Sequence, residues 1–228
     1  MMNPTEAPAI GRSIARRLRL SELEELCTEL QPWRTDPVFA DIPPSVRSHL
    51  LFPFAKGLRL SARLIYVLRD ALSSFDCCVN WGQLLADERL CSPECDVIIH
   101  RPGHVRRWNG HDGRVMDFHF VDAGRALAVV SCKSLMTRVD RQYARKMKDY
   151  VADVFLFAEC CKPGKADRLK AAALEAGYQA FGYLYTFEIE SGKCENRSDV
   201  WEEFLKTLAS RVRQRMVEVP SSGSGEAE

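Results

Sequence analysis

Two polar residues at apolar strands in the middle of the chain carry the clearest chemistry that the sequence offers. Asp96 enters the run Cys-Asp-Val-Ile-Ile-His at 95–100, and Lys133 ends the run Ala-Val-Val-Ser-Cys-Lys at 128–133. Residues two apart on a strand face the same side, so Ser131 and Lys133 would project together and Cys132 the opposite way. A carboxylate can hold a divalent cation, and a lysine can neutralise a phosphate, so the pair indicates phosphodiester chemistry.

Each residue also has a plainer interpretation, in which Asp96 belongs to a turn and Lys133 is a solvated strand-end lysine. Other chemistries find less support. Neither G-x-G-x-x-G nor G-x4-G-K-[ST] occurs, which disfavours dinucleotide and P-loop sites. The nine cysteines lack the paired C-x2-C spacing of a zinc ribbon, and Cys132 would face away from a site formed by Ser131 and Lys133.

The spacing of apolar residues predicts the elements that must position this pair. An N-terminal amphipathic helix at 13–31 precedes a connector at 32–53 that holds five prolines. The remaining pattern predicts helices at 56–73, 140–151, 165–176 and 199–216 and strands at 95–100, 114–121, 125–134, 153–158 and 181–187. The Ala123-Gly124 turn suggests a hairpin between the second and third of these strands.

This order predicts an α/β fold with a mixed central sheet flanked by helices. We expect a helical extension and Pro-rich connector at 1–55, one α/β domain at 56–218, and a disordered tail at 219–228 that is rich in Ser and Gly. The N-terminal helix offers a surface for a homodimer or a protein partner.

Composition limits the classes of partner. The apolar fraction is 46%, the charged fraction 28% and the net charge +1, so the chain resembles an ordinary globular protein without a strong overall field. No apolar run approaches the roughly 20 residues of a membrane span, and no signal peptide is apparent. We therefore expect a cytoplasmic protein with reduced cysteines and no membrane association.

Two local basic clusters flank the proposed site and would supply contacts to a nucleic-acid backbone. The first includes Arg106 and Arg107, and the second includes Arg138, Arg141 and Arg145 on the helix that follows Lys133. The alternative is that these residues form ordinary solvated faces.

The motifs and the order of elements resemble the PD-(D/E)xK nuclease superfamily. Within it, Ser-Pro-Glu-Cys-Asp-Val-Ile-Ile and Ala-Val-Val-Ser-Cys-Lys-Ser-Leu look most like bacterial nuclease-like domains with S-x-Q-x-D-I-I-I and V-x-E-V-K-S-x-L strands, matching at Ser92, Asp96, Lys133, Ser134 and Leu135. The resemblance implies a restriction-endonuclease-like α-β-β-β-α-β core over 56–187 and cleavage of DNA with Mg²⁺ or Mn²⁺. Its catalytic positions would be Asp96, Lys133 and Ser131.

Ser131 is a departure, because the family carries Asp or Glu at that position. Gln83 likewise stands where an upstream acid often occurs. A second metal ligand would have to come from Glu94, which we pair with Asp96, or from Asp117 or Asp70. The sequence thus favours a metal-dependent nuclease, with two alternatives: a degenerate pseudo-nuclease that binds nucleic acid or protein, and an interaction module that uses the N-terminal helix.

Overall fold

The computed structural model of the chain describes residues 53–86, 90–108, 118–188, 191 and 193–218. Its first half runs through α5 (Pro53–Ala71), β1 (Cys78–Leu85), β2 (Cys95–His100), β3 (Arg106–Trp108), β4 (Phe118–Asp122) and a 3-10 turn at Ala123–Arg125. Its second half consists of β5 (Ala126–Met136), α6 (Arg141–Met147), β6 (Val154–Cys161), α7 (Ala166–Ala176), β7 (Phe181–Phe187), β8 (Cys194–Asn196) and α8 (Ser198–Glu218).

The strands form one mixed sheet of eight strands in the order β3-β4-β1-β2-β5-β6-β7-β8. At its centre, β1 and β2 are antiparallel, β2 and β5 are antiparallel, and β5, β6 and β7 are parallel. The α/β fold class with a mixed central sheet is confirmed. The predicted strands at 95–100, 114–121 and 125–134 correspond to β2, β4 and β5, whereas β1 and β3 were not predicted.

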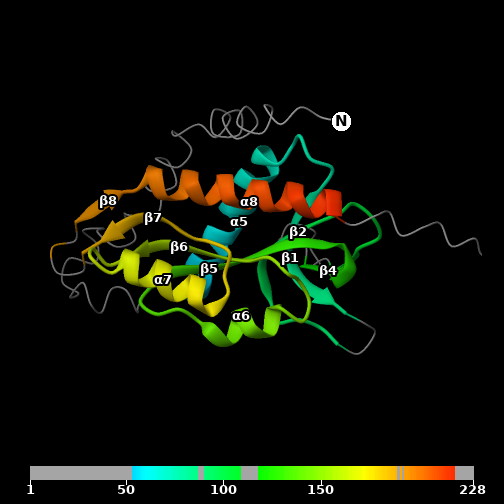
Figure 1. Cartoon of the computed structure of the whole chain (residues 1–228), viewed down its shortest axis with the longest axis horizontal. Helices are drawn as coiled ribbons and strands as arrows, with labels where there is room; N and C mark the ends of the chain where they lie inside the picture. Colours follow the sequence, from blue (N-terminus) through cyan, green and yellow to red (C-terminus); the bar gives the residue numbers. More distant parts are fainter. Residues whose placement is uncertain (1–52, 87–89, 109–117, 189–190, 192, 219–228) are drawn as a thin grey trace, which may run out of the picture.

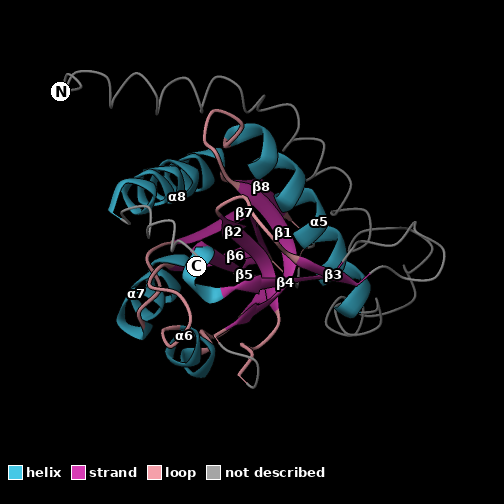
Figure 2. Ribbon diagram, turned by 90° about the vertical axis from the view of Figure 1, so that its right-hand side faces the viewer, coloured by secondary structure: helices cyan, strands magenta, loops and turns pink. Residues whose placement is uncertain are grey.

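Helices cover both faces of this sheet, as Figures 1 and 2 show. One core lies under α5 and α8 and includes Leu68, Val130 and Phe204. The other lies under α6 and α7 and includes Ile98, Met147 and Leu169. Because β6 and β7 are covered on both faces, all their residues are buried, as is usual for parallel strands.

Local chemistry explains where the helices begin and end. Asp140 caps α6, because its carboxylate accepts hydrogen bonds from the backbone N–H groups of Gln142 and Tyr143. Gly177 ends α7 in the left-handed conformation with φ of 97°, which a glycine adopts without steric cost. None of the described helices is long and apolar enough to cross a membrane.

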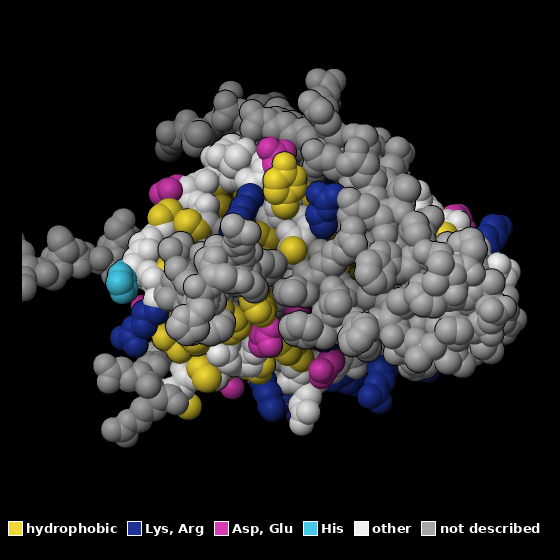
Figure 3. Space-filling view, turned by 180° about the vertical axis from the view of Figure 1, so that it is seen from behind, with side chains coloured by type: hydrophobic (Ala, Val, Ile, Leu, Met, Phe, Trp, Pro, Cys, Tyr) yellow, Lys and Arg dark blue, Asp and Glu magenta, His cyan; other side chains and the backbone are white. Residues whose placement is uncertain are grey.

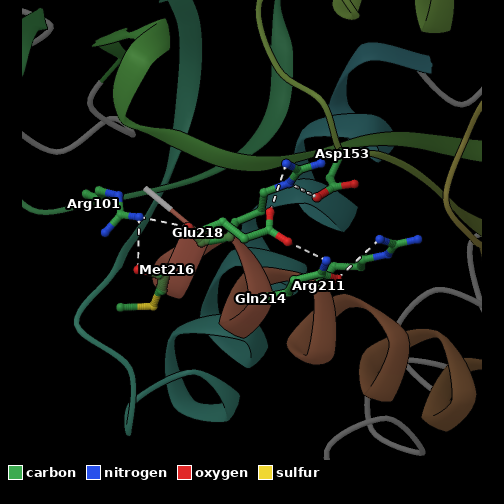
Figure 4. A network of polar contacts seen from close by, with 7 residues as sticks. Arg101, Asp153, Arg211, Gln214, Met216 and Glu218 are labelled. Atoms are coloured by element: carbon green, nitrogen blue, oxygen red, sulfur yellow. Dashed lines mark hydrogen bonds and ion pairs between the residues drawn. The ribbon is translucent and has the colours of Figure 1, made fainter. Parts of the chain in front are cut away.

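The C-terminal end of α8 is tied to the sheet by two arginines (Figure 4). Arg215 Nε donates to Oδ2 of Asp153 at 2.7 Å, and Asp153 is 0% exposed just before β6. Arg101 Nη2 donates to the backbone oxygens of Arg215 and Met216 at 2.8 and 3.1 Å. The two bonds from Arg101 satisfy carbonyl groups of the kind that every helix leaves free at its C-terminus.

Some predicted elements differ from the structure. β4 and β5 do not form a hairpin, because β4 pairs with β1 and β3, whereas β5 pairs with β2 and β6. The Ala123-Gly124 turn is a tight 3-10 turn held by the Asp122 carboxylate, which accepts from the N–H of Gly124. The predicted segments at 1–52, 109–117 and 219–228 lie outside the described residues, and with them the N-terminal helix and Asp117.

Candidate functional site

Asp96 lies half-buried at the start of β2, and its carboxylate is directed toward β5. Its Oδ2 accepts a hydrogen bond from the backbone N–H of Cys132 at 2.8 Å. It also bonds to the hydroxyl of Ser61, a buried residue of α5. A bulge in β1 lies beside this point, at Gly82, where a Cβ would come within 1.8 Å of the backbone oxygen of His119. Strand pairing and the packing of α5 therefore bring the Asp96 carboxylate together with the Cys132 N–H and the Ser61 hydroxyl.

Ser131 lies on β5, the strand next to that of Asp96. The register of β2 with β5 ends at Val97 and Val130, and Asp96 is bound to the backbone N–H of Cys132, the residue that follows Ser131. Ser131 is 1% exposed, and its Oγ has no hydrogen-bond partner within the described part of the chain. The position where the resemblance implies an acid is thus adjacent in the chain to the residue that binds Asp96, and its hydroxyl is buried without a partner among the described residues.

Lys133 completes the group two residues further along β5. It is half-buried, and its charge lowers the pKa of Asp96. Among the described residues, no acidic side chain forms an ion pair with it.

The three acids that might supply a second metal ligand differ in position. Glu94 is exposed, its charge raises the pKa of Asp96, and its Oε1 accepts from the indole N–H of Trp81 at 2.9 Å. Asp70 lies nine residues from Ser61 on α5, about 13 Å along the helix axis. Asp117 lies outside the described residues. Of the two acids that the structure describes, Glu94 is thus the one near Asp96.

The electrostatic environment works against charge on Asp96. Burial raises the pKa of Asp96 most, and the hydrogen bond from Cys132 and the charge of Lys133 lower it by smaller amounts. Burial likewise raises the pKa of the Cys132 thiol well above its ordinary value, so this cysteine is neutral. Lysine and arginine side chains are interspersed with acids on the face seen in Figure 3.

Two tyrosines hold the segment before Asp96 against α6 and the turn that follows it. The Tyr143 hydroxyl donates to the backbone oxygen of Glu94 at 3.4 Å, and that of Tyr150 donates to the backbone oxygen of Cys91 at 2.9 Å. These two hydrogen bonds place α6 and the turn after it next to the candidate site.

The basic residues that were predicted to contact nucleic acid lie on α6, just before α6 and on β3. Arg141 and Arg145 are exposed, but at 100° per residue they point about 160–200° away from Tyr143 around α6. Arg141 also forms an ion pair with Glu175 at 2.8 Å. Arg138 is exposed before α6. Two more arginines come from β3, which is separated from β2 by two strands: Arg106, which is exposed, and Arg107, whose side chain lies outside the described part of the structure.

A divalent metal fits these donors poorly. Mg²⁺ favours carboxylate oxygens, yet Glu94 is the one described carboxylate near Asp96, and the other groups around it are the Ser61 hydroxyl and the neutral thiol of Cys132. The described residues include no group of three or more His, Cys, Asp or Glu side chains that could hold a metal ion. Their eight cysteines are free thiols. The donors near Asp96 do not form a protein-held metal site.

Two residues of this site, Ser61 and Trp81, were missed from the sequence. Ser61 lies 35 positions before Asp96, and nothing in an amphipathic helix distinguishes a serine that faces a carboxylate. Trp81 and Tyr143 act through single hydrogen bonds to Glu94, which depend on strand order and helix docking. The Trp81-Gly82 pair before the Asp96 strand was the one available signal, because glycine inside a strand often marks a bulge.

No protein-family model matches the chain, and no curated protein sequence matches it. Among solved structures, it is similar to NucC of E. coli MS115-1 in the cAAA-bound form, with 12% identity, 90% of each chain covered and a TM-score of 0.49. It is also similar to NucC of P. aeruginosa ATCC27853 in the cAAA-bound form, with 11% identity, 94% of this chain and 92% of that chain covered, and a TM-score of 0.48. Identities this low leave the roles of individual residues to be argued from the site itself.

Proposed function

We propose that this chain is a nuclease-like protein of the restriction-endonuclease-like type, and that it binds DNA at a phosphodiester site centred on Asp96 and Lys133. Its capacity for metal-dependent cleavage is reduced, because Ser131 replaces the second carboxylate. The observation that carries the proposal is the binding of the Asp96 carboxylate to the Cys132 N–H on β5, next to Ser131, whose buried hydroxyl has no partner among the described residues.

The residues support binding more strongly than hydrolysis. Lys133 has no acidic partner among the described residues, so a phosphate oxygen can be its counter-ion. Asp96, with its raised pKa and its bond to the Cys132 N–H, is held in a fixed orientation at the same point. Such a site recognises a phosphodiester but lacks the negative charge that would concentrate a divalent cation.

Restoring the missing acid tests this proposal. With supercoiled plasmid or single-stranded DNA and Mg²⁺ or Mn²⁺, Ser131→Glu should cleave on the order of 100-fold faster than the unaltered protein. Adding Asp96→Ala or Lys133→Ala should return Ser131→Glu to background. The matched control is Ser134→Glu, which adds the same acid three residues away on the opposite face of β5.

Two results would contradict the proposal. If the unaltered protein already cleaves as fast as Ser131→Glu, the site is not degenerate. If neither protein binds or cleaves DNA, the chain is not nuclease-like in function.

A second candidate is an active Mg²⁺- or Mn²⁺-dependent nuclease that uses Glu94 beside Asp96. It is favoured by the place of Glu94 two residues before Asp96, where its charge raises the pKa of Asp96. In that case the unaltered protein cleaves DNA, and Glu94→Gln abolishes cleavage while Glu88→Gln does not. Cytoplasmic location and a homodimer or protein partner through the N-terminal helix remain predictions from the sequence.

A further inference from the structure

A groove runs along the outer edge of β7, between α7 and α8, which lie on either side of this strand in Figures 1 and 2. β8 pairs with β7 only at residues 185–187. Among the strands in the described part of the chain, β6 alone pairs with β7 at residues 181–183. The cavity along this edge has a volume of about 530 Å³, and we call it the β7 groove.

The floor of the β7 groove is the edge of a strand. Phe181 and Tyr183 line it, and their side chains pack into the core under α6 and α7. The Ala180 oxygen accepts from the N–H of Leu156 on β6, and in a parallel ladder alternate residues bond to the neighbouring strand. Phe181 and Tyr183 therefore direct their backbone N–H and C=O groups away from β6. Backbone groups in such a row can pair with an added strand.

The walls of the β7 groove are one stripe of each helix. Asp167, Lys170 and Leu174 stand at positions i, i+3 and i+7 of α7, so they share one face of that helix. Lining residues at the same spacing on α8 are Val200, Glu203 and Thr207. A strand on the edge of β7 would direct alternate side chains to the two stripes.

The β7 groove carries a net negative charge. Three acids line it, Asp167, Asp199 and Glu203, against two bases, Lys170 and Arg197. Lys170 forms an ion pair with Glu203 at 3.5 Å, and Arg197 forms one with Asp199 at 2.8 Å, so the remaining charge is that of Asp167. This balance favours a partner segment that brings a basic residue.

The far end of the α7 stripe is apolar. Leu174 is 49% exposed, which is unusual for a large apolar side chain in this structure. Asp167 and Leu174 are seven residues apart, about 10 Å along the helix axis. Residues two and four positions apart on one face of an extended strand bracket that distance. A segment that fits therefore carries an apolar and a basic residue at one of these two spacings.

The ion pair between Lys170 and Glu203 joins α7 to α8 across the β7 groove. Its side chains are 51% and 69% exposed, and an ion pair with this exposure contributes little to stability. It can therefore open when a segment enters. While it is closed, it shields the strand edge from indiscriminate pairing.

We propose that the β7 groove binds an extended peptide segment of a protein partner, which adds to the sheet as a strand on β7. The segment places a basic side chain at Asp167 and an apolar side chain at Leu174. This inference goes beyond the proposed function, because β7 is two strands from β5 and the groove shares no residue with the Asp96–Lys133 site.

Selection from a displayed library of random nonapeptides on the full-length protein tests the proposal. Enriched peptides should carry Lys or Arg two or four positions from an apolar residue, and fluorescence anisotropy then measures their affinity. Methylation of the backbone nitrogen should abolish binding at alternate positions, because those N–H groups bond to β7. At the intervening positions it should change the affinity less than about twofold.

Three variants of exposed lining residues locate the bound peptide. Leu174→Glu should weaken binding about tenfold or more, and Asp167→Asn about threefold. Lys170→Gln should strengthen binding about twofold, because it removes both the cover and a positive charge. The matched controls are Arg168→Gln and Asp149→Asn, exposed residues that do not line the β7 groove, and both should bind like the unaltered protein.

Three results would overturn the proposal. If no peptide is enriched on the unaltered protein relative to Leu174→Glu, the two helices and their ion pair only shield the edge of β7. If binding does not depend on which nitrogen is methylated, the peptide does not add as a strand. If no peptide binds and analytical ultracentrifugation shows self-association that Leu174→Glu removes, the groove receives a second copy of this chain. DNA binding at Asp96 and Lys133 is measured separately and affects none of these outcomes.

Discussion

A carboxylate that is withdrawn from water destabilises a folded protein unless charge or hydrogen bonds compensate, and Asp96 is such a residue. Burial raises its pKa, and the Cys132 N–H, Lys133 and Ser61 offset that effect only in part. A residue that destabilises the fold in its charged form is typical of functional sites. The neighbouring Ser131 hydroxyl, buried without a partner, adds a second uncompensated polar group.

Asp96→Asn should therefore raise the melting temperature near neutral pH. Because the pKa of Asp96 is raised in the folded state, its contribution to stability is present below the ordinary Asp range and is lost as pH rises through the folded pKa. Asparagine keeps an oxygen for the Cys132 N–H and carries no charge. Thermal unfolding should show the gain near pH 7 and a smaller gain as the pH is lowered toward 4.

The control is Asp149→Asn, an exposed aspartate after α6, which should change stability by less than about 0.5 kcal/mol. A lower melting temperature for Asp96→Asn near neutral pH would mean that Asp96 stabilises the fold as the partner of Lys133.

At the scale of elements, a chain of hydrogen bonds joins α5, β1 and β2 behind the site. Arg69 donates to Oδ1 of Asn80 at 3.1 Å, and Nδ2 of Asn80 lies 2.7 Å from Nε2 of His100. Because the Asn80 nitrogen donates, Nε2 accepts and Nδ1–H donates to the Arg101 carbonyl at 2.8 Å. His100 is therefore neutral in the fold.

This arrangement predicts a loss of stability in mild acid. Burial lowers the pKa of His100, and the charges of His119 and Arg125 lower it further. The unfolded chain takes up a proton near pH 6.5, so the contribution of His100 is present above that value and is lost as pH falls below it. Urea unfolding should give a smaller free energy at about pH 5.5 than at pH 7.

The difference in unfolding free energy between pH 7 and about pH 5.5 should be smaller in His100→Gln. It should be unchanged in His104→Gln, which replaces an exposed histidine. Identical pH dependence in His100→Gln and the unaltered protein would exclude His100 as its source.

The ion pair between Arg215 of α8 and Asp153 predicts which of the two residues costs more stability when it is replaced. Asp153 is 0% exposed and its Oδ1 has no partner among the described residues, whereas Arg215 keeps 35% of its side chain exposed. Arg215→Met leaves a buried, uncompensated carboxylate and should cost about 3–5 kcal/mol. Asp153→Ala leaves an arginine that can reach water and should cost less.

Urea unfolding of both variants measures this order, and Arg211→Met on the same helix is the control. An equal or larger loss for Asp153→Ala would mean that the Asp153 carboxylate is stabilised mainly by groups other than Arg215.

The elements differ in how far the sequence predicts them. β2 was predicted with its observed bounds, and α7, β7 and α8 within about two residues, because their apolar patterns are long and end at turn or cap residues. Short β3 and β8 carry no periodicity to detect. The prediction of a hairpin at Ala123-Gly124 was wrong. β4 pairs in parallel with β1 instead, and this pairing joins Trp81 to Phe118, which lie 37 residues apart in the sequence.

At the scale of the whole molecule, the fold brings together residues that the sequence placed far apart. Asp96 binds the N–H of Cys132 because β2 and β5 are neighbours, and Glu94 contacts Trp81 because β1 flanks β2. The sequence predicted Asp96, Lys133, Ser131 and Glu94 as one group, but not the contact of Trp81 with Glu94, which requires knowledge of strand order. With a net charge of +1, attraction to nucleic acid must come from such local groups.

The most direct test of this account is the affinity of the protein for single-stranded DNA before and after loss of the lysine at its centre. Equilibrium binding at low and moderate salt should show that Lys133→Met weakens binding about tenfold and lowers the salt dependence, while Lys162→Met at a surface turn has little effect. Binding that is absent in the unaltered protein, or unchanged in Lys133→Met, would contradict a phosphodiester site at Asp96 and Lys133.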